Sequence, residues 1–199
     1  MASPLIVAVG GTLRNHSSTE KALRCTLAAA ERMGARTRLF SGPALDLPLY
    51  SPERMERTPE ALALLDALRE ADGVILGSPG YHGGVSGLVK NVLDYTEDLR
   101  EGPRAYLEGR AVGCIGAGGG WQGAMAALGA LRIIVHALRG WNTPLGVAIN
   151  TAEPAFDEHG ACLNVRLEEQ LEMMAAQVVG FTSGQAGQIP APQLRVAAA

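Results

Sequence analysis

Short hydrophobic segments alternate with longer segments of helical periodicity along most of the chain. Five segments have the length and the bounding turn residues of strands, and they comprise residues 5–9, 36–40, 74–76, 111–115 and 144–149. Each is followed by a segment in which apolar side chains recur every three or four residues, as on one face of a helix. Strands that alternate with helices in this way predict a parallel sheet with helices on both faces.

Local signals bound the helices between these strands. Ser17 and Glu20 have the spacing of a capping box, and Gly34 follows the last apolar position of the first helix. Thr58 and Pro59 form an N-cap followed by proline at the first helical position. The remaining helices are expected at residues 86–96, 123–138 and 163–179. The helix at 123–138 has no charge before Arg132, so we expect the sheet or a second subunit to bury most of its surface.

Right-handed crossovers leave few ways to order five parallel strands. The pattern fits an α/β, flavodoxin-like three-layer sandwich with strand order 2-1-3-4-5 and a switch point between strands one and three. A chain of 199 residues suits one hydrophobic core, so we predict one domain over residues 1–184 and a tail over 185–199. Ligands of such sheets bind beyond the carboxyl ends of the strands, at the switch point.

Composition and charge narrow the class of protein. Apolar residues make up 47% of the chain and charged residues 19%, which indicates a globular rather than a disordered protein. The net charge of −3 argues against nucleic-acid binding. No apolar run approaches the ~18 residues that cross a bilayer, and the first apolar run reads as a strand rather than a signal peptide. We therefore expect no membrane partner.

Cysteine and histidine residues are dispersed along the chain. The three cysteines lie far apart and form no CxxC motif, so neither a zinc site nor a redox dithiol is indicated, and no metal is expected. An odd number of cysteines fits a reducing compartment, and we expect a cytoplasmic protein. Cys114, in the fourth strand, is interpreted as inert core. His136, Trp121 and Trp141 are interpreted as packing or interface residues.

A glycine-rich loop follows the third strand. Residues 77–94 read GSPGYHGGVSGLVKNVLD, and the glycines would let a flat ligand approach the backbone without meeting a Cβ. Tyr81 and His82 are the large side chains of this loop. We interpret the loop as a platform for an aromatic ring system such as a flavin. The alternative is an ordinary strand-to-helix turn, because glycine and proline mark all such turns.

A polar loop follows the first strand. Thr12, Ser17, Ser18 and Thr19 supply hydroxyl groups, and Arg14 supplies a fork of donors suited to phosphate oxygens. The next helix directs its free N–H groups and its positive dipole end toward the same place. These features predict a phosphate site. The alternative is that Ser17 only caps the helix and that Arg14 is merely exposed.

A second glycine cluster follows the fourth strand. Gly118, Gly120 and Gly123 formally match GxGxxG, but no acidic residue follows about 20 positions later and the cluster does not follow the first strand. A dinucleotide fingerprint is therefore disfavoured. We interpret the cluster as backbone donors facing the polar edge of a ring, with close helix–strand packing as the alternative.

Three stretches together resemble the NADPH-dependent FMN reductase family of flavodoxin-like proteins. They are GGTLRNHSST after the first strand, DLPLY at residues 46–50 and GSPGYHGGVSGLVKNVLDY at residues 77–95, within a likeness over residues 4–180. The resemblance implies that the first loop holds the FMN phosphate, the second packs on the flavin and the third lies near its pyrimidine edge. The residues expected to contact the cofactor are Thr12, Arg14, Ser17, Ser18, Thr19, Pro79, Gly80, Tyr81, His82, Gly83, Val85, Gly118, Gly119 and Gly120.

The same resemblance implies an activity. NADPH or NADH would pass hydride to bound FMN, and a second flavin, a quinone, an azo compound or oxygen would accept the electrons, with no catalytic side chain required. A flavin-dependent monooxygenase is a possible partner, and relatives are commonly homodimers or homotetramers. Gly80 and His82 depart from the glutamate and asparagine that many members carry there, which leaves the acceptor open.

Two other functions remain open from the sequence. The first is a flavodoxin-type electron carrier, although such carriers tend to be strongly acidic and this chain has a net charge of only −3. The second is a flavin-free α/β protein, such as an assembly subunit. Steady NADPH oxidation by the purified protein would distinguish an enzyme from the carrier. The absence of flavin absorbance after mixing with FMN would favour the flavin-free protein.

Overall fold

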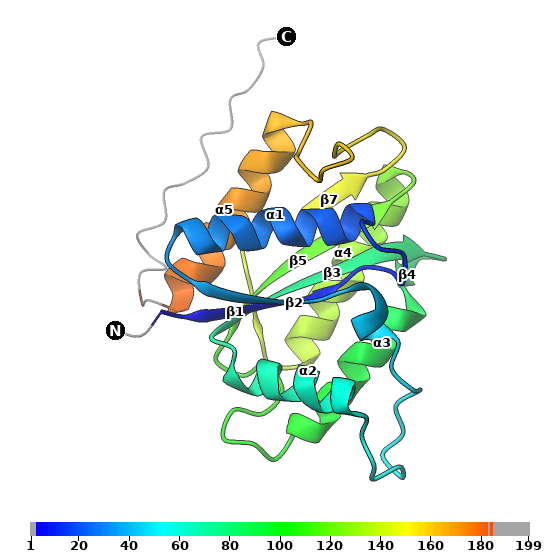
Figure 1. Cartoon of the computed structure of the whole chain (residues 1–199), viewed down its shortest axis with the longest axis vertical. Coiled ribbons are helices and arrows are strands. Elements are labelled where there is room, and N and C mark those ends of the chain that lie inside the picture. The colour runs from blue at the N-terminus through cyan, green and yellow to red at the C-terminus, as the bar shows by residue number, and fades with distance from the viewer. Residues whose placement is uncertain (1–2, 183, 185–199) are drawn as a thin grey trace.

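A central parallel sheet separates two layers of helices (Figure 1). The computed structural model describes residues 3–182 and residue 184, so the expected tail at 185–199 lies outside the described residues. The main strands are β1 Leu5–Gly10, β2 Arg36–Phe40, β3 Gly73–Tyr81 and β5 Ala111–Gly118, with the short strands β4 Gly84–Val85, β6 Trp141–Asn142 and β7 Val147–Asn150. The order β2-β1-β3-β5-β6, with β7 also on β5, confirms the predicted flavodoxin-like arrangement.

Each face of the sheet has its own helices and its own apolar core. Helices α1 Ser18–Arg32 and α5 Val165–Thr182 cover one face, and α2 Pro59–Glu70, α3 Gly87–Asp94 and α4 Trp121–Ala137 cover the other (Figure 1). Along β1, Val7 and Val9 join one core whereas Ile6 and Ala8 join the other, because side chains alternate across a strand. Two 3₁₀ turns, η1 Gly42–Leu45 and η2 Tyr95–Leu99, complete the second layer.

The predicted helix caps are present. Ser17 Oγ accepts a hydrogen bond from Glu20 N at 3.3 Å, and Thr58 Oγ1 accepts one from Ala61 N at 3.2 Å. Glu20 does not close the capping box on Ser17 itself; its carboxylate accepts from His16 N at 2.9 Å. Each cap satisfies an N–H that the helix cannot pair internally.

The third strand is longer than the sequence indicates. β3 runs through Pro79 and Gly80 to Tyr81, so the first part of the expected loop is a strand and only His82 and Gly83 form a turn before β4. Both turn residues have positive φ, as in the tight turns that join antiparallel strands. Beyond Gly77, β3 pairs with β5 as far as Pro79 and with β4 at Gly80 and Tyr81, and this pairing overrides the low strand propensity of glycine and proline.

The fifth strand is broken, which corrects the expected strand at 144–149. β6 and β7 both pair in parallel with β5, but residues 143–146 separate them. Pro144 has no N–H to donate to the ladder, so the pairing cannot continue through it. Arg132 occupies the gap, with Nη1 donating to Thr143 O at 2.9 Å and its own carbonyl accepting from Asn142 Nδ2 at 2.9 Å.

Helix α4 is buried on only one face, whereas its lack of charge predicted that most of its surface would be buried. Five residues, Ala124, Ala127, Leu128, Leu131 and Val135, pack on the sheet. The opposite side carries Trp121, Met125 and Ile133, with exposed fractions of 62%, 55% and 72%. His136 and Trp141 are also exposed. The described part of the chain therefore leaves an apolar stripe on α4 uncovered.

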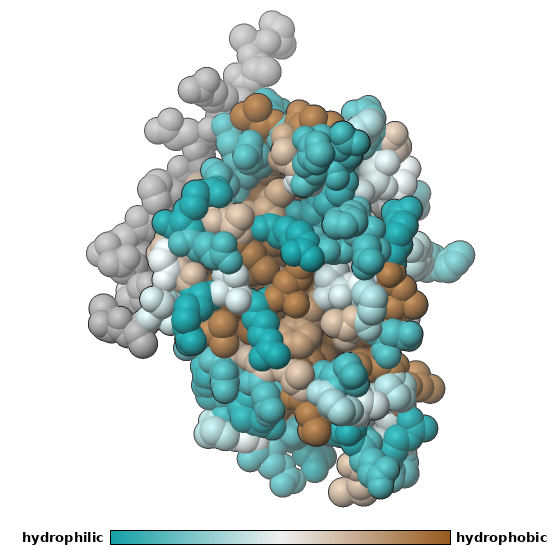
Figure 2. Space-filling model, in the orientation of Figure 1, coloured by the Kyte–Doolittle hydropathy of each residue, from teal (hydrophilic) through white to brown (hydrophobic). Residues whose placement is uncertain are grey.

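The free edge of the sheet at β2 is protected by charge. Arg36 and Arg38 are exposed, and the Arg38 guanidinium lies 4.9 Å from the centre of the Phe40 ring. Figure 2, in the same view as Figure 1, shows mostly hydrophilic side chains around a small apolar area in the centre of the visible face. Charged edge strands resist pairing with other chains. In the part of the chain that the structure describes, no helix combines the length and apolarity needed to cross a membrane.

Candidate functional site

Three loops lie side by side at the carboxyl edge of the sheet. Gly10 of β1 is the register partner of Gly77 of β3, and Gly11 N donates to Gly77 O at 3.2 Å. On the other side, Pro79 of β3 pairs with Ala117 of β5. The polar loop, the glycine-rich hairpin and the second glycine cluster therefore leave adjacent strands, as the order 2-1-3-4-5 requires.

The first loop presents donors toward solvent. Thr12 Oγ1 accepts from Arg14 N at 3.2 Å and shapes the turn, while the Arg14 side chain is exposed. No acceptor among the described residues binds the Arg14 guanidinium. Ser18 and Thr19 are the first residues of α1, so the helix offers no carbonyl to their N–H groups. An anion at this place would meet free N–H groups, a guanidinium and a positive helix end.

Two hydroxyl-bearing residues of the loop are buried. Ser17 and Thr19 are buried, and the Thr19 methyl group packs toward Gly77. The Ser17 hydroxyl accepts a hydrogen bond from Glu20 N, which is its capping role. A role in phosphate binding would use the same hydroxyl group. Glu20 is a buried carboxylate beside the loop, and Arg24 neutralises it at 2.8 Å.

Ser41, at the end of β2, is a residue that sequence reasoning missed. Its Oγ is buried and has no hydrogen-bond partner within residues 3–182 and 184. It would lie 2.9 Å from a Cβ on Gly11, with Ser17 Oγ 3.6 Å from the same point. Unpaired buried hydroxyls are rare, and one beneath an anion-suited loop fits a site whose hydrogen bonds are completed by a ligand or by water. Its position directly after a strand was the available signal.

The hairpin after β3 is closed from within. Ser78 Oγ donates to Pro79 O at 2.8 Å and accepts from Ser86 N at 3.0 Å, and Ser86 caps α3. Pro79 is buried in the sheet, whereas Tyr81, His82 and Gly83 are exposed at the tip. Val85 is half-buried opposite Gly80. The hairpin thus offers one aromatic and one imidazole ring on a fixed backbone.

Gly80 is dictated by packing between β3 and α4. A Cβ at this position would lie 2.2 Å from Gly123 O and 2.8 Å from Gly123 C. The glutamate that many relatives carry here would displace the helix. Gly80 is therefore a close-approach glycine, and its contribution to a ligand can only come from its backbone.

The third loop is partly open. A Cβ on Gly118 would lie 2.7 Å from Ala124 N, so that glycine serves helix packing, whereas Gly119 and Gly120 have no atom nearby. Thr151 N donates to Gly118 O at 2.7 Å and ties the loop to the chain beyond β7.

Burial raises the pKa of the Cys114 thiol to about 12, against a smaller opposing effect of Arg132. This confirms Cys114 as an inert core residue.

The DLPLY segment is held by Asn91 of α3. Asn91 Nδ2 donates to Leu47 O and Pro48 O, both at 3.1 Å, and its Oδ1 accepts from Tyr50 N at 2.8 Å. Because α3 begins directly after the hairpin, this bracket connects the loop after β2 to the glycine-rich loop. This role of Asn91 was not predicted from the sequence.

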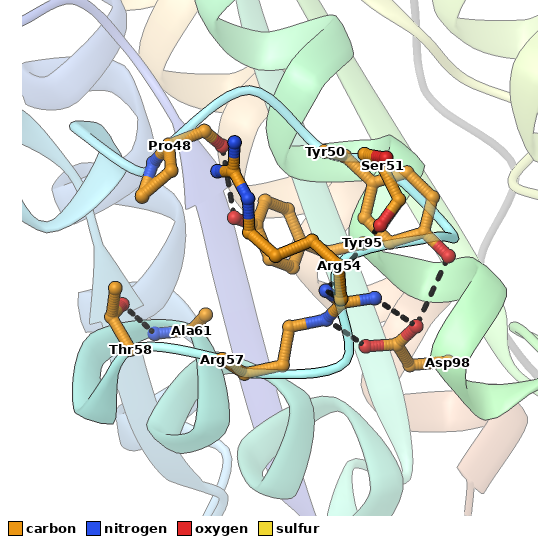
Figure 3. A network of polar contacts seen from close by, with 9 residues as sticks. All are labelled: Pro48, Tyr50, Ser51, Arg54, Arg57, Thr58, Ala61, Tyr95 and Asp98. Carbon is orange, nitrogen blue, oxygen red and sulfur yellow. Dashed lines mark hydrogen bonds and ion pairs between the residues drawn. The ribbon is translucent and has the colours of Figure 1, made fainter.

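Arg57 fastens the far end of the same loop to η2 (Figure 3). Its guanidinium binds Asp98 through two N–H groups, at 2.6 and 3.0 Å, and lies 4.9 Å from the centre of the Tyr50 ring. Tyr50 Oη also donates to Asp98, at 3.1 Å, and the Tyr95 hydroxyl donates to Pro48 O at 2.9 Å. Hydrogen bonds from Arg57 lower the pKa of Asp98, with partial burial opposing them.

This ion pair predicts a pH dependence. A carboxylate whose pKa is lowered by folding stabilises the fold above its unfolded pKa, and that stabilisation is lost as the pH falls through the folded value. We expect Asp98→Asn to reduce the free energy of unfolding by about 1–2 kcal/mol near pH 7. The difference from the wild type should shrink below about pH 4. Urea unfolding across pH measures it, and a difference that is independent of pH would contradict the assignment.

Within the described residues, no three His, Cys, Asp or Glu side chains are grouped to hold a metal ion. The carboxyl edge instead combines an anion-suited loop, a rigid hairpin with few side chains and open backbone donors. These are the requirements of a ligand with a phosphate at one end and a flat ring at the other.

The sequence of the chain is similar to those of known FMN-dependent reductases. The family model for NADPH-dependent FMN reductase matches residues 4–154. An FMN-dependent NADPH-azoreductase from Staphylococcus aureus is 35% identical over 115 residues, which cover 57% of this chain and 57% of the relative. The chain thus matches a little over half the length of that curated relative.

Solved structures share the fold at low identity. FerB, a flavoenzyme NAD(P)H:(acceptor) oxidoreductase from Paracoccus denitrificans, superposes with a TM-score of 0.76 at 21% identity, covering 92% of this chain and 98% of that one. The NADH:FMN oxidoreductase EMOB, in its apo form, has a TM-score of 0.65 at 20% identity, covering 88% and 90%. At such identities the likeness concerns the fold alone.

Proposed function

The chain belongs to the NADPH-dependent FMN reductase family, and from this premise we propose that it binds FMN at the carboxyl edge and passes hydride from NADPH or NADH to a small acceptor. The observation that carries the proposal is the adjacency of the polar loop and the glycine-rich hairpin, joined at Gly10 and Gly77. FMN, when bound, supplies the hydride chemistry. The acceptor class is a free flavin, a quinone, an azo compound or oxygen.

The residues of the chain bind and orient rather than react. Arg14 and the N–H groups of Ser18 and Thr19 would hold the phosphate, while Thr12 and Ser17 shape the loop around it. Tyr81, His82, Gly83 and Val85 would border the ring at the hairpin. The open backbone of Gly119 and Gly120 would face its polar edge, where N–H donors stabilise negative charge.

Replacing Arg14 tests this assignment. We expect Arg14→Ala to weaken FMN binding by about ten- to a hundredfold, because it removes one charge-assisted contact to phosphate. Binding of riboflavin, which lacks the phosphate, should be unchanged. Arg36→Ala, another exposed arginine at the opposite end of the sheet, is the matched control. Fluorescence titration measures both ligands, and an Arg14→Ala variant with wild-type FMN affinity would remove the assignment.

Two readouts distinguish the enzyme from its rivals. An electron carrier would bind FMN but would not oxidise NADPH steadily with free FMN or a quinone. A flavin-free protein would show no flavin absorbance after mixing with FMN. The −3 net charge and the membership in a reductase family favour the enzyme. One consumer of its reduced flavin would be a flavin-dependent monooxygenase. The free cysteines at positions 25, 114 and 162 are compatible with a cytoplasmic protein.

We also propose that α4 forms the contact of a homodimer or homotetramer. Its stripe of Trp121, Met125 and Ile133 is exposed and uncharged, as the core of a protein interface is. Ile133→Glu should lower the assembly state in sedimentation velocity. Val165→Glu, an exposed apolar residue of α5, should not. An unchanged assembly state in Ile133→Glu would exclude this face.

A further inference from the structure

Three arginines meet at the opposite edge of the sheet, where the strands begin. Arg69 lies in the last turn of α2, Arg110 directly precedes β5, and Arg104 lies in the segment that leads to it. Together with Leu99, Gly102 and Pro103 they line a cavity of about 20 Å³. No carboxylate of the described residues lines this cavity. It therefore brings like charges together around a small, partly open cavity.

Arg110 is the buried member of the cluster, with 0% of its surface exposed. Its Nε donates to Ala71 O at 2.9 Å, and its Nη2 donates to Arg69 O at 3.0 Å. Nη1 donates to Tyr106 O and Glu108 O at 3.1 and 3.4 Å. A guanidinium has five N–H groups. The second N–H of Nη2 has no acceptor among the described residues.

The charge of the cluster is only partly compensated. Arg69 pairs with Asp66 on the outer surface, whereas Arg104 donates only to a carbonyl, Arg69 O, at 3.2 Å. Burial lowers the pKa of Arg110 to about 10, and Arg104 acts in the same direction while Asp72 opposes them. Buried charges in proteins are normally paired. Main-chain carbonyls provide dipoles here, but they provide no net negative charge.

We propose that this cavity binds one small inorganic anion of about the size of chloride. A cavity needs roughly 10–15 Å³ to admit one water molecule, so this one admits a monatomic ion but not a whole phosphate group. The ion accepts the spare N–H of Arg110 and offsets the charge of Arg104. It thereby fastens the turn-rich segment 99–110 to the end of α2. The site is separate from the carboxyl edge and does not depend on FMN.

Anion exchange tests the site in the intact protein. Thermal unfolding is compared in equal concentrations of sodium chloride and sodium gluconate, since gluconate is too large for the cavity. We expect chloride to raise the Tm by about 3–6 °C, as for a ligand present at tenfold its Kd. Arg104→Gln should abolish this difference whatever its own stability. Arg100→Gln should keep it, because Arg100 pairs with Glu97 and Glu101 and does not line the cavity.

Crystals soaked in sodium bromide locate the ion directly. An anomalous difference peak within hydrogen-bond reach of Arg110 Nη2 is the expected result. A cavity that contains only water after the soak overturns the proposal. So does a Tm that is equal in chloride and gluconate, or a chloride effect that survives in Arg104→Gln.

Discussion

Gly10→Ala is expected to cost about 3–5 kcal/mol of folding free energy or to prevent folding. A Cβ at this position would lie 1.8 Å from Gly77 O, inside the pairing of the two central strands. Gly10 also has φ of +145°, a conformation that residues with a Cβ avoid. Both strands would have to separate below the two loops that we assign to FMN.

Urea unfolding and FMN titration measure the effect of Gly10→Ala. The midpoint should fall sharply, and any folded fraction should bind FMN weakly. Gly119→Ala is the matched control, because its Cβ would meet no atom within 4 Å and its φ is not positive. It should unfold within about 0.5 kcal/mol of the wild type. A Gly10→Ala protein of normal stability would show that β1 and β3 do not pair as described.

Arg110→Met should destabilise the fold by about 3–5 kcal/mol. The substitution keeps an apolar stem of similar length but removes the donors of four main-chain carbonyls, those of Arg69, Ala71, Tyr106 and Glu108. Two of these carbonyls lie at the carboxyl end of α2, where a positive charge is favourable. Replacing a buried cation by a methionine also removes a desolvation cost, which keeps the loss below the sum of four hydrogen bonds.

Two companion variants define the role of Arg110. Arg110→Lys retains the charge but can donate to fewer of the carbonyls, so its loss should be intermediate. Arg69→Met removes an exposed guanidinium and leaves the Arg69 carbonyl in place, so its unfolding midpoint should hardly change. An Arg110→Met protein that unfolds at the wild-type urea concentration would show that water replaces the side chain without cost.

Much of the carboxyl edge was predictable because its signals are local. Ser17 and Thr58 cap their helices, and the polar and glycine-rich loops follow strands one and three. Parallel strands with right-handed crossovers must then bring those loops together. The contacts of individual site residues with a flavin remain predictions, although Gly80 is now assigned to packing against Gly123.

The errors concern features that depend on distant parts of the chain. The extension of β3 as far as Pro79 depends on pairing with β5, and the break of the fifth strand depends on how Pro144 meets that ladder. Arg57 and Asp98 are 41 positions apart, and neither belongs to a motif. Ser41 was missed because its burial beside Gly11 is visible only once β1 and β2 are paired.

By itself, the sequence determined the alternation of strands and helices, the helix caps, the family and the edge of the sheet to which the polar and glycine-rich loops belong. Periodicity and capping act over a few residues, so they can be read along the chain. Only the tertiary structure decided which face of α4 stays uncovered, why Gly80 lacks a side chain and how Arg110 is buried without a carboxylate. These properties arise from which surfaces meet, and that depends on long-range packing that no short segment encodes.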